Sequence, residues 1–267
     1  MTDIASYYAD LTALEWQIDL GADEAIQDTP VNRFDQVVTP AKGAIPKTGP
    51  SSNIKPVDFM PVIPQVQESA PDIARIMAGR CNDLAALRDA LAVFEHCAIK
   101  KGARNLVFAA GHPSARVMVI GEGPSRDEDK TGEPFIGRSG ALLDKMFAAI
   151  GLSRGNEDSH SALYITNVLP WRTPQNRDPE PEEIAMMLPF LERHIALVNP
   201  DVIVALGNIP CKALLGRTGI TRMRGKWVEA FGKPVLPMFH PSALLRDPAK
   251  KRDSWNDLLD IKARLQS

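Results

Sequence analysis

The chain has few cysteines and no long apolar run, and each shortage excludes a class of protein. Cys81, Cys97 and Cys211 are too few and too scattered for a disulfide framework or a four-thiolate metal site. The apolar runs fall short of the roughly 18 residues that span a bilayer, so we expect no membrane association. The N-terminus is acidic where a signal peptide is basic. We therefore expect a cytoplasmic protein.

Charge is balanced over the whole chain but not along it. The net charge is −2, yet residues 1–75 hold eleven acidic and five basic side chains. Residues 211–267 hold twelve basic and five acidic side chains. A basic C-terminal portion favours a surface that faces a polyanion, although charge runs are more often simply solvated.

Proline divides the sequence into two parts. Residues 12–34 have a helical pattern, and seven prolines lie between residues 38 and 71, where neither a helix nor a central strand can persist. We expect residues 1–75 to be a helix and a proline-rich linker, partly disordered. Residues 76–267 are then the folded domain, and we expect it to act as a monomer.

Short apolar runs alternate with helical patterns in the second part. The expected strands are 117–120, 163–169, 202–206 and 235–239; the expected helices between and after them are 141–152, 182–198, 208–216 and 253–265. Continuous apolar strands separated by helices are typical of a parallel sheet covered on both faces. The sequence therefore predicts a three-layer α/β/α domain around a central four-stranded parallel sheet.

Polar residues follow these runs where a ligand would bind. Glu122 comes after the first strand, Asn167 ends the second, and His240 follows the fourth. In such sheets ligands bind beyond the carboxyl ends of the strands. Each residue alone could equally be an N-cap, a turn residue or a structural histidine, but all three on one rim favour a site.

The loop after the first strand is rich in glycine but does not match a phosphate-binding loop. It lacks the GxxxxGK[ST] pattern, and it carries the carboxylates of Glu122, Asp127, Glu128 and Asp129. Acids suit a reaction that develops positive charge or needs a positioned water molecule. Phe135, later in the loop, fits either the core or a stacking platform.

Five segments together resemble the family 4 uracil-DNA glycosylases. They are GEGPSRDEDKTGEPFIGRSGALLDKM, YITNVLPWRTPQNRDPEPEEI, NPDVIVALGN, RGKW and HPSALLRDP. The resemblance runs in unbroken order from about residue 105 to 265. It implies an enzyme that hydrolyses the N-glycosidic bond of uracil in single- or double-stranded DNA and so starts base excision repair.

The resemblance also implies roles for individual residues. Catalysis is assigned to Glu122, which positions the attacking water, to His240, which stabilises the leaving uracil anion, and to Glu128, whose role is less defined. The remaining assignments are Gly121, Gly123, Phe135 (stacking) and Asn167 (base reading) for the substrate, and Ser242, Leu244, Arg246 and Lys250 for DNA. These roles match the chemistry, because base release creates oxocarbenium character on the sugar and negative charge on uracil. A base that leaves the stack also needs a stacking platform and an apolar wedge.

This sequence departs from the family in one respect. In most family 4 enzymes four cysteines hold an iron–sulfur cluster. Only Cys97 occupies an expected ligand position; Phe94, Met187 and a residue near Ile203 stand at the others. One thiolate cannot hold a cluster, so we expect neither a metal nor any other cofactor.

Two other functions compete with a glycosylase that uses water as its nucleophile. The first is a protein that binds uracil-DNA and traps it covalently through its histidine; relatives of that kind carry Gln after the motif glutamate, where this chain has Gly123. The second is a nucleotide-binding or interaction domain with an inactive site. Retention of Glu122, Asn167 and His240 together argues against the second.

Overall fold

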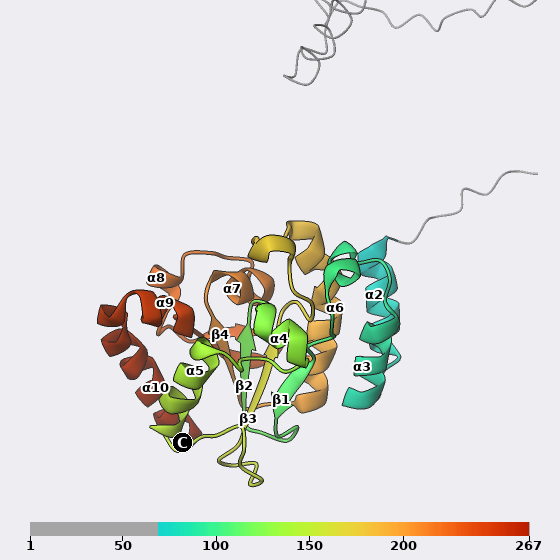
Figure 1. Ribbon diagram of the computed structural model, residues 1–267. Coiled ribbons are helices and arrows are strands. Elements are labelled where there is room, and N and C mark those ends of the chain that lie inside the picture. The colour runs from blue at the N-terminus through green and yellow to red at the C-terminus, as the bar shows by residue number, and fades with distance from the viewer. Residues whose placement is uncertain (1–68, 267) are drawn as a thin grey trace, which may run out of the picture. The chain divides into compact units, whose positions relative to one another are not determined.

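The computed structural model describes residues 69–266, which form a six-stranded sheet between helices (Figure 1). The strand order is β1-β3-β2-β4-β6-β5. The strands are β1 (Ala109–Gly111), β2 (Val117–Gly121), β3 (Leu163–Asn167), β4 (Val202–Leu206), β5 (Val228–Ala230) and β6 (Lys233–Met238). The helix expected at 12–34 and nearly all of the proline-rich stretch lie outside the described residues.

The four expected strands form the parallel centre of the sheet, and two edge strands were missed. β3, β2, β4 and β6 pair in parallel, whereas β1 pairs antiparallel with β3 and β5 antiparallel with β6. The sheet therefore has six strands rather than four. β1 and β5 have only three residues each and lie partly exposed, so neither produces the continuous apolar run by which the central strands are recognised.

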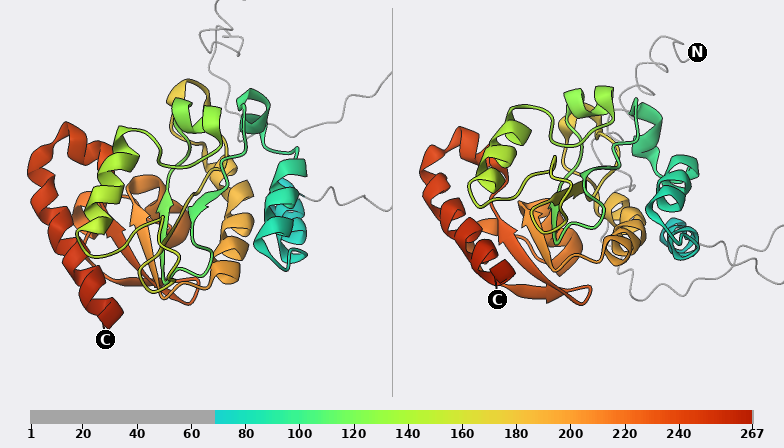
Figure 2. Two further views of the ribbon diagram at one scale, coloured as in Figure 1. Left: turned by 60° about the horizontal axis from the view of Figure 1, so that its bottom comes forward. Right: turned by 90° about the horizontal axis from the view of Figure 1, so that it is seen from below.

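Helices cover both faces of the sheet (Figure 2). They are α2 (Ala70–Gly79), α3 (Leu84–Val93), α4 (Arg126–Thr131), α5 (Arg138–Ala148), α6 (Pro181–Val198), α7 (Asn208–Leu215), α8 (Ile220–Met223), α9 (Pro241–Arg246) and α10 (Lys251–Gln266), with single 3₁₀ turns at Ala98–Gly102, Pro174–Asn176 and Pro248–Lys250. None of the helices in residues 69–266 is long and apolar enough to cross a membrane. α2 crosses the domain boundary expected at residue 75.

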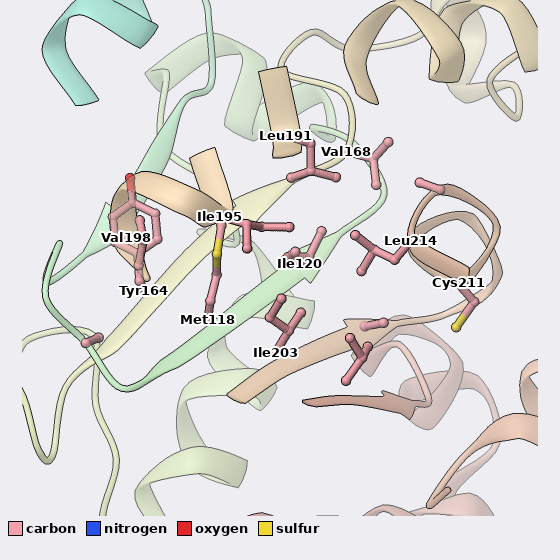
Figure 3. Close-up of a cluster of buried hydrophobic side chains, with 14 of the residues drawn as sticks. Met118, Ile120, Tyr164, Val168, Leu191, Ile195, Val198, Ile203, Cys211 and Leu214 are labelled. Carbon is pink, nitrogen blue, oxygen red and sulfur yellow. The ribbon is translucent and has the colours of Figure 1, made fainter. Parts of the chain in front are cut away.

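Alternation along the central strands divides the core into two clusters. Met118 and Ile120 of β2 point toward α6 and α7 in the cluster of Figure 3, whereas Val117 and Val119 point toward α5 and α10. Successive side chains of a strand project to opposite faces, so each face of the fully buried β2 is apolar. This burial on both sides explains why the central strands are uninterrupted apolar runs.

α6 has sequence signals at both of its ends. Glu180 and Glu183 form a capping box at its start, and Pro181 takes the first helical position, where no N–H is needed. Asn199, in the left-handed conformation with φ 51°, ends the helix before Pro200. α2 and α3 pack against α6 and enclose a third apolar cluster.

Candidate active site

A cavity of about 660 Å³ opens at the carboxyl ends of the central strands. Five residues predicted from the sequence line it: Glu122, Gly123, His240, Ser242 and Arg246. Three others lie against one another beside β2, since a Cβ atom on Gly121 would meet the side chains of both Asn167 and Phe135. These three residues do not line the cavity itself, and neither do Glu128, Leu244 and Lys250.

His240 is fixed in one tautomer. Its Nδ1 accepts a hydrogen bond from the backbone N–H of Ser242 at 3.1 Å, and the Ser242 hydroxyl lies 2.8 Å from the same nitrogen. Burial, with a contribution from the charge on Arg246, lowers the pKa of His240 to about 4. The ring is therefore neutral at neutral pH, and its proton is on Nε2, which can donate to a ligand.

Phe135 has a backbone conformation that is rare for a residue with a side chain. Its φ is 56°, and its ring lies 5.5 Å from the His240 ring, tilted by 35°. The guanidinium of Arg154 donates to the carbonyl oxygens of Pro134 at 2.9 Å and Phe135 at 3.1 Å, and pairs with Asp144 of α5 at 2.8 Å. A Cβ atom on Gly140 would lie 1.6 Å from the backbone oxygen of Phe135. The loop that carries Phe135 can therefore pack against α5 at this point only if residue 140 is glycine.

Asn167 is buried without hydrogen-bond partners. Asn167 is the last residue of β3 and is 6% exposed. Neither Oδ1 nor Nδ2 of its side chain has a hydrogen-bond partner within the described residues. A Cβ atom on Gly121 would lie 2.3 Å from this Oδ1 and 2.6 Å from Cζ of Phe135, so glycine is needed for the amide and the ring to lie together. Buried amide groups are rarely left unpaired, and both atoms are explained if a ligand pairs with them.

Glu122 lies beyond the end of β2, next to a carboxylate that the sequence analysis did not identify. Burial raises the pKa of Glu122, and the negative charge of Asp178 raises it further. Asp178 also lines the cavity. Asp178 lies in the segment NRDPEP after the second central strand. Its position beyond the end of a strand is the sequence signal by which it could have been identified. Two carboxylates in one cavity are suited to hold a water molecule or to face a developing cation.

Glu128 has a different place from the one expected. Its carboxylate accepts the backbone N–H of Ser125 at 2.7 Å, and the Ser125 hydroxyl accepts the N–H of Glu128, so the pair forms the capping box of α4. The carboxylate is thereby engaged at the helix start and is not part of the cavity wall. Because Ser125 does line the cavity, Glu128 holds the loop that follows Glu122.

The C-terminal segment also differs in detail from the expectation. Leu244, expected to contact DNA, is 1% exposed in the core, whereas Leu245 is 38% exposed. α9 starts at Pro241, and its turn directs Leu244 inward. Lys250 pairs with Asp247 at 3.2 Å and lies over the Phe239 ring, so it is beside the cavity rather than in it.

The residues at the expected cluster positions form a hydrophobic core. Phe94, Cys97 and Met187 belong to the third apolar cluster, together with Trp171. Ile203, the residue near the fourth expected position, belongs to a different cluster, within β4, and so does not lie with the other three. Burial raises the pKa of the Cys97 thiol, and the Cys81 thiol of the same cluster donates to the carbonyl oxygens of Met77 and Ala86. Two thiols among aromatic and thioether groups do not fit an iron–sulfur cluster.

Comparison with known proteins shows which family this chain matches. The family model of the uracil DNA glycosylase superfamily matches residues 108–259. The type-4 uracil-DNA glycosylase of Archaeoglobus fulgidus is 40% identical over 174 residues, 62% of this chain and 84% of the relative. The Thermotoga maritima protein of the same name is 42% identical over 154 residues (57% and 77%), and a type-5 uracil-DNA glycosylase of Pyrobaculum aerophilum is 33% identical over 146 residues (50% and 64%).

Proposed function

Because the chain belongs to the uracil DNA glycosylase superfamily, we propose that it is a monofunctional glycosylase that removes uracil from DNA by hydrolysis. The observation that carries this proposal is the buried, unpaired amide of Asn167, which lies with the Phe135 ring at Gly121. That ring lies 5.5 Å from the ring of neutral His240. The relatives named type-4 uracil-DNA glycosylases support the same activity. The product, an abasic site, is the starting point of base excision repair.

Recognition uses Phe135 and Asn167. An extrahelical uracil stacks on the Phe135 ring, while the Asn167 amide accepts from uracil N3–H through Oδ1 and donates to O4 through Nδ2. Cytosine presents the opposite pattern at these two positions. Discrimination between the two bases therefore requires that the Asn167 amide keeps one orientation when the base is bound.

The chemical step separates charge across the glycosidic bond. The C1′–N1 bond breaks, and its electron pair leaves with uracil as an anion. Nε2–H of His240 donates to the carbonyl oxygen on which that negative charge collects. The sugar becomes an oxocarbenium ion, which the carboxylate of Glu122 stabilises while it orients a water molecule. The water oxygen bonds to C1′, and its proton passes to Glu122.

An oligonucleotide assay tests the proposal. The protein is incubated with single- and double-stranded DNA that contains one uracil, and alkali then reveals abasic sites. We expect strand cleavage at the uracil, with Glu122→Gln slower by roughly 10²–10⁴-fold. Hypoxanthine and xanthine, which also gain a carbonyl group by deamination, are included as further substrates.

Two outcomes would contradict the proposal. Absence of alkali-labile sites on both DNA forms would exclude glycosylase activity. A protein–DNA complex that survives boiling in detergent, with one uracil released per trapped strand and no turnover, would instead indicate a binding protein that traps DNA through a bond from His240 to C1′.

A further inference from the structure

A second hollow lies beside the catalytic cavity, and basic residues dominate its wall. It has a volume of about 320 Å³, and the residues that line it are Arg104, Arg126, Asp129, Lys130 and Arg172. They come from three separate parts of the chain: the segment after the 3₁₀ turn at Ala98–Gly102, helix α4, and the segment after β3. The formal charge of the wall is +3.

The single carboxylate of the hollow is engaged with the backbone. Oδ1 of Asp129 accepts the N–H groups of Arg104 at 2.8 Å and Asn105 at 3.3 Å, and the residue is buried. In residues 69–266, no carboxylate forms an ion pair with Arg104, Arg126 or Arg172. Like charges gathered around one concavity repel one another unless an anion enters it.

Hydrogen bonds fix the walls of the hollow. Nδ2 of Asn105 donates to the carbonyl oxygens of Asp129 at 2.8 Å and Lys130 at 3.0 Å, which joins the Arg104 segment to α4. Nε of Arg172 donates to Oδ1 of Asn176 at 2.9 Å. This bond orients the guanidinium and leaves its terminal amino groups to bind an anion.

The hollow and the catalytic cavity are neighbours along two chain segments. Ser125 lines the cavity and Arg126 the hollow; Thr173 lines the cavity and Arg172 the hollow. α4 itself lies beyond the carboxyl end of β2, on the side where the cavity opens (Figure 1). An anion in the hollow is therefore next to any ligand in the cavity.

We propose that this hollow binds phosphodiester groups of the DNA strand that flank the nucleotide held in the cavity. The inference rests on the proposed function for its ligand, DNA. Arginine suits this role because its planar guanidinium donates two parallel hydrogen bonds to one phosphate. Arg246, the last residue of α9, lines the cavity, so the strand would meet cations both there and on the α4 side.

Binding without turnover provides the first test. The probe is an oligonucleotide with 2′-fluoro-deoxyuridine, whose fluorine disfavours the oxocarbenium ion, and its dissociation constant is measured by fluorescence anisotropy at several salt concentrations. We expect Arg104→Ala/Arg126→Ala to weaken binding about tenfold and to reduce the salt slope by about one to two. Arg80→Ala/Arg88→Ala removes the same charge from exposed positions at the end of α2 and on α3 and should bind as the unmodified protein does.

Neutral linkages locate the contact. One phosphodiester at a time is replaced by a methylphosphonate, and each oligonucleotide is measured with both proteins. We expect one or two linkages beside the uracil whose neutralisation weakens binding to the unmodified protein but not to the Arg104→Ala/Arg126→Ala protein. Arg126→Lys keeps the charge but loses the paired donors, so its dissociation constant should lie between those of the unmodified protein and the Arg104→Ala/Arg126→Ala protein.

The inference is overturned if the double variant binds DNA unchanged, or if every linkage weakens both proteins equally. Binding of free inorganic phosphate in the hollow without any effect on DNA would also overturn it. Because uracil release is measured separately, a protein that binds DNA through the hollow but releases no base contradicts only the proposed function. A protein that releases uracil while the variants bind normally contradicts only this inference.

Discussion

Arg154 holds the backbone of Phe135 in its left-handed conformation: the guanidinium donates to the Phe135 carbonyl oxygen at 3.1 Å. A non-glycine residue with positive φ costs roughly 1–3 kcal/mol and persists only where its surroundings impose it. The ring on which we propose that the base stacks thus depends on a side chain from the loop between α5 and β3, outside the cavity.

We predict that Arg154→Ala raises KM for a uracil oligonucleotide and lowers kcat/KM by about tenfold or more, because the Phe135 ring is no longer pre-positioned. Steady-state kinetics measures the effect. Arg116→Ala is the matched control, since Arg116 is also partly buried, ion-paired with Asp201 and bonded to a carbonyl oxygen. An equal loss of activity in both variants would mean that Arg154 contributes only to stability.

The charge of Asp178 should shift the acid side of the pH profile, which burial of Glu122 mainly determines. Glu122 must be ionised to stabilise the oxocarbenium ion, and its pKa is raised by burial and by Asp178. Activity should therefore fall as the pH decreases through this raised pKa. Asp178→Asn removes the repulsion, so the falling limb of kcat/KM should move to lower pH, as measured between about pH 4.5 and about 8. If the limb does not move, Asp178 does not influence the ionisation of Glu122.

His240 should make stability depend on pH. Its pKa is about 4 in the folded protein, against an ordinary value of 6.5, so between these values the unfolded chain binds more protons. The free energy of unfolding should fall with decreasing pH below about 6.5, at up to about 1.4 kcal/mol per pH unit.

Buried His194, with a pKa of about 3, acts in the same direction. The free energy of unfolding, measured by urea denaturation at several pH values, should therefore depend less steeply on pH in His240→Gln than in the unmodified protein. Some dependence on pH should remain. An unchanged slope would indicate that His240 titrates normally.

Asn167→Asp should change base selection. A carboxylate repels uracil O4 and accepts from cytosine N4, so we expect kcat/KM for uracil to fall roughly 10²–10³-fold while the preference over cytosine shrinks. Asn82→Asp places the same charge at an exposed position between α2 and α3, outside the cavity, and serves as the control. Unchanged selectivity in Asn167→Asp would show that Asn167 does not read the base.

The apolar group that includes Phe94, Cys97, Trp171 and Met187 predicts a colourless protein. Purified protein should lack the broad visible absorption of an iron–sulfur cluster and contain well under one iron atom per chain. Cys97→Ala should retain activity, with a small loss of stability from the vacated volume. Stoichiometric iron and sulfide would contradict the assignment.

The sequence determined the centre of the fold and the position of the site along it. The strands buried on both faces are continuous apolar runs, so β2, β3, β4 and β6 were predictable, and the polar residues that follow them had to meet at one edge. Glu122, Asn167 and His240 were identified in this way. β1 and β5 were not, because three-residue edge strands leave no comparable pattern.

Only the tertiary structure distinguished between neighbouring residues of the same type. Glu122 and Glu128 are six positions apart in one acidic loop, yet the first lines the cavity and the second caps α4, because the helix begins at Arg126. Leu244 and Leu245 are adjacent, and the phase of α9 buries one and exposes the other. Asp178 and Arg154 act through contacts between segments distant in sequence, and such contacts exist only once the chain has packed.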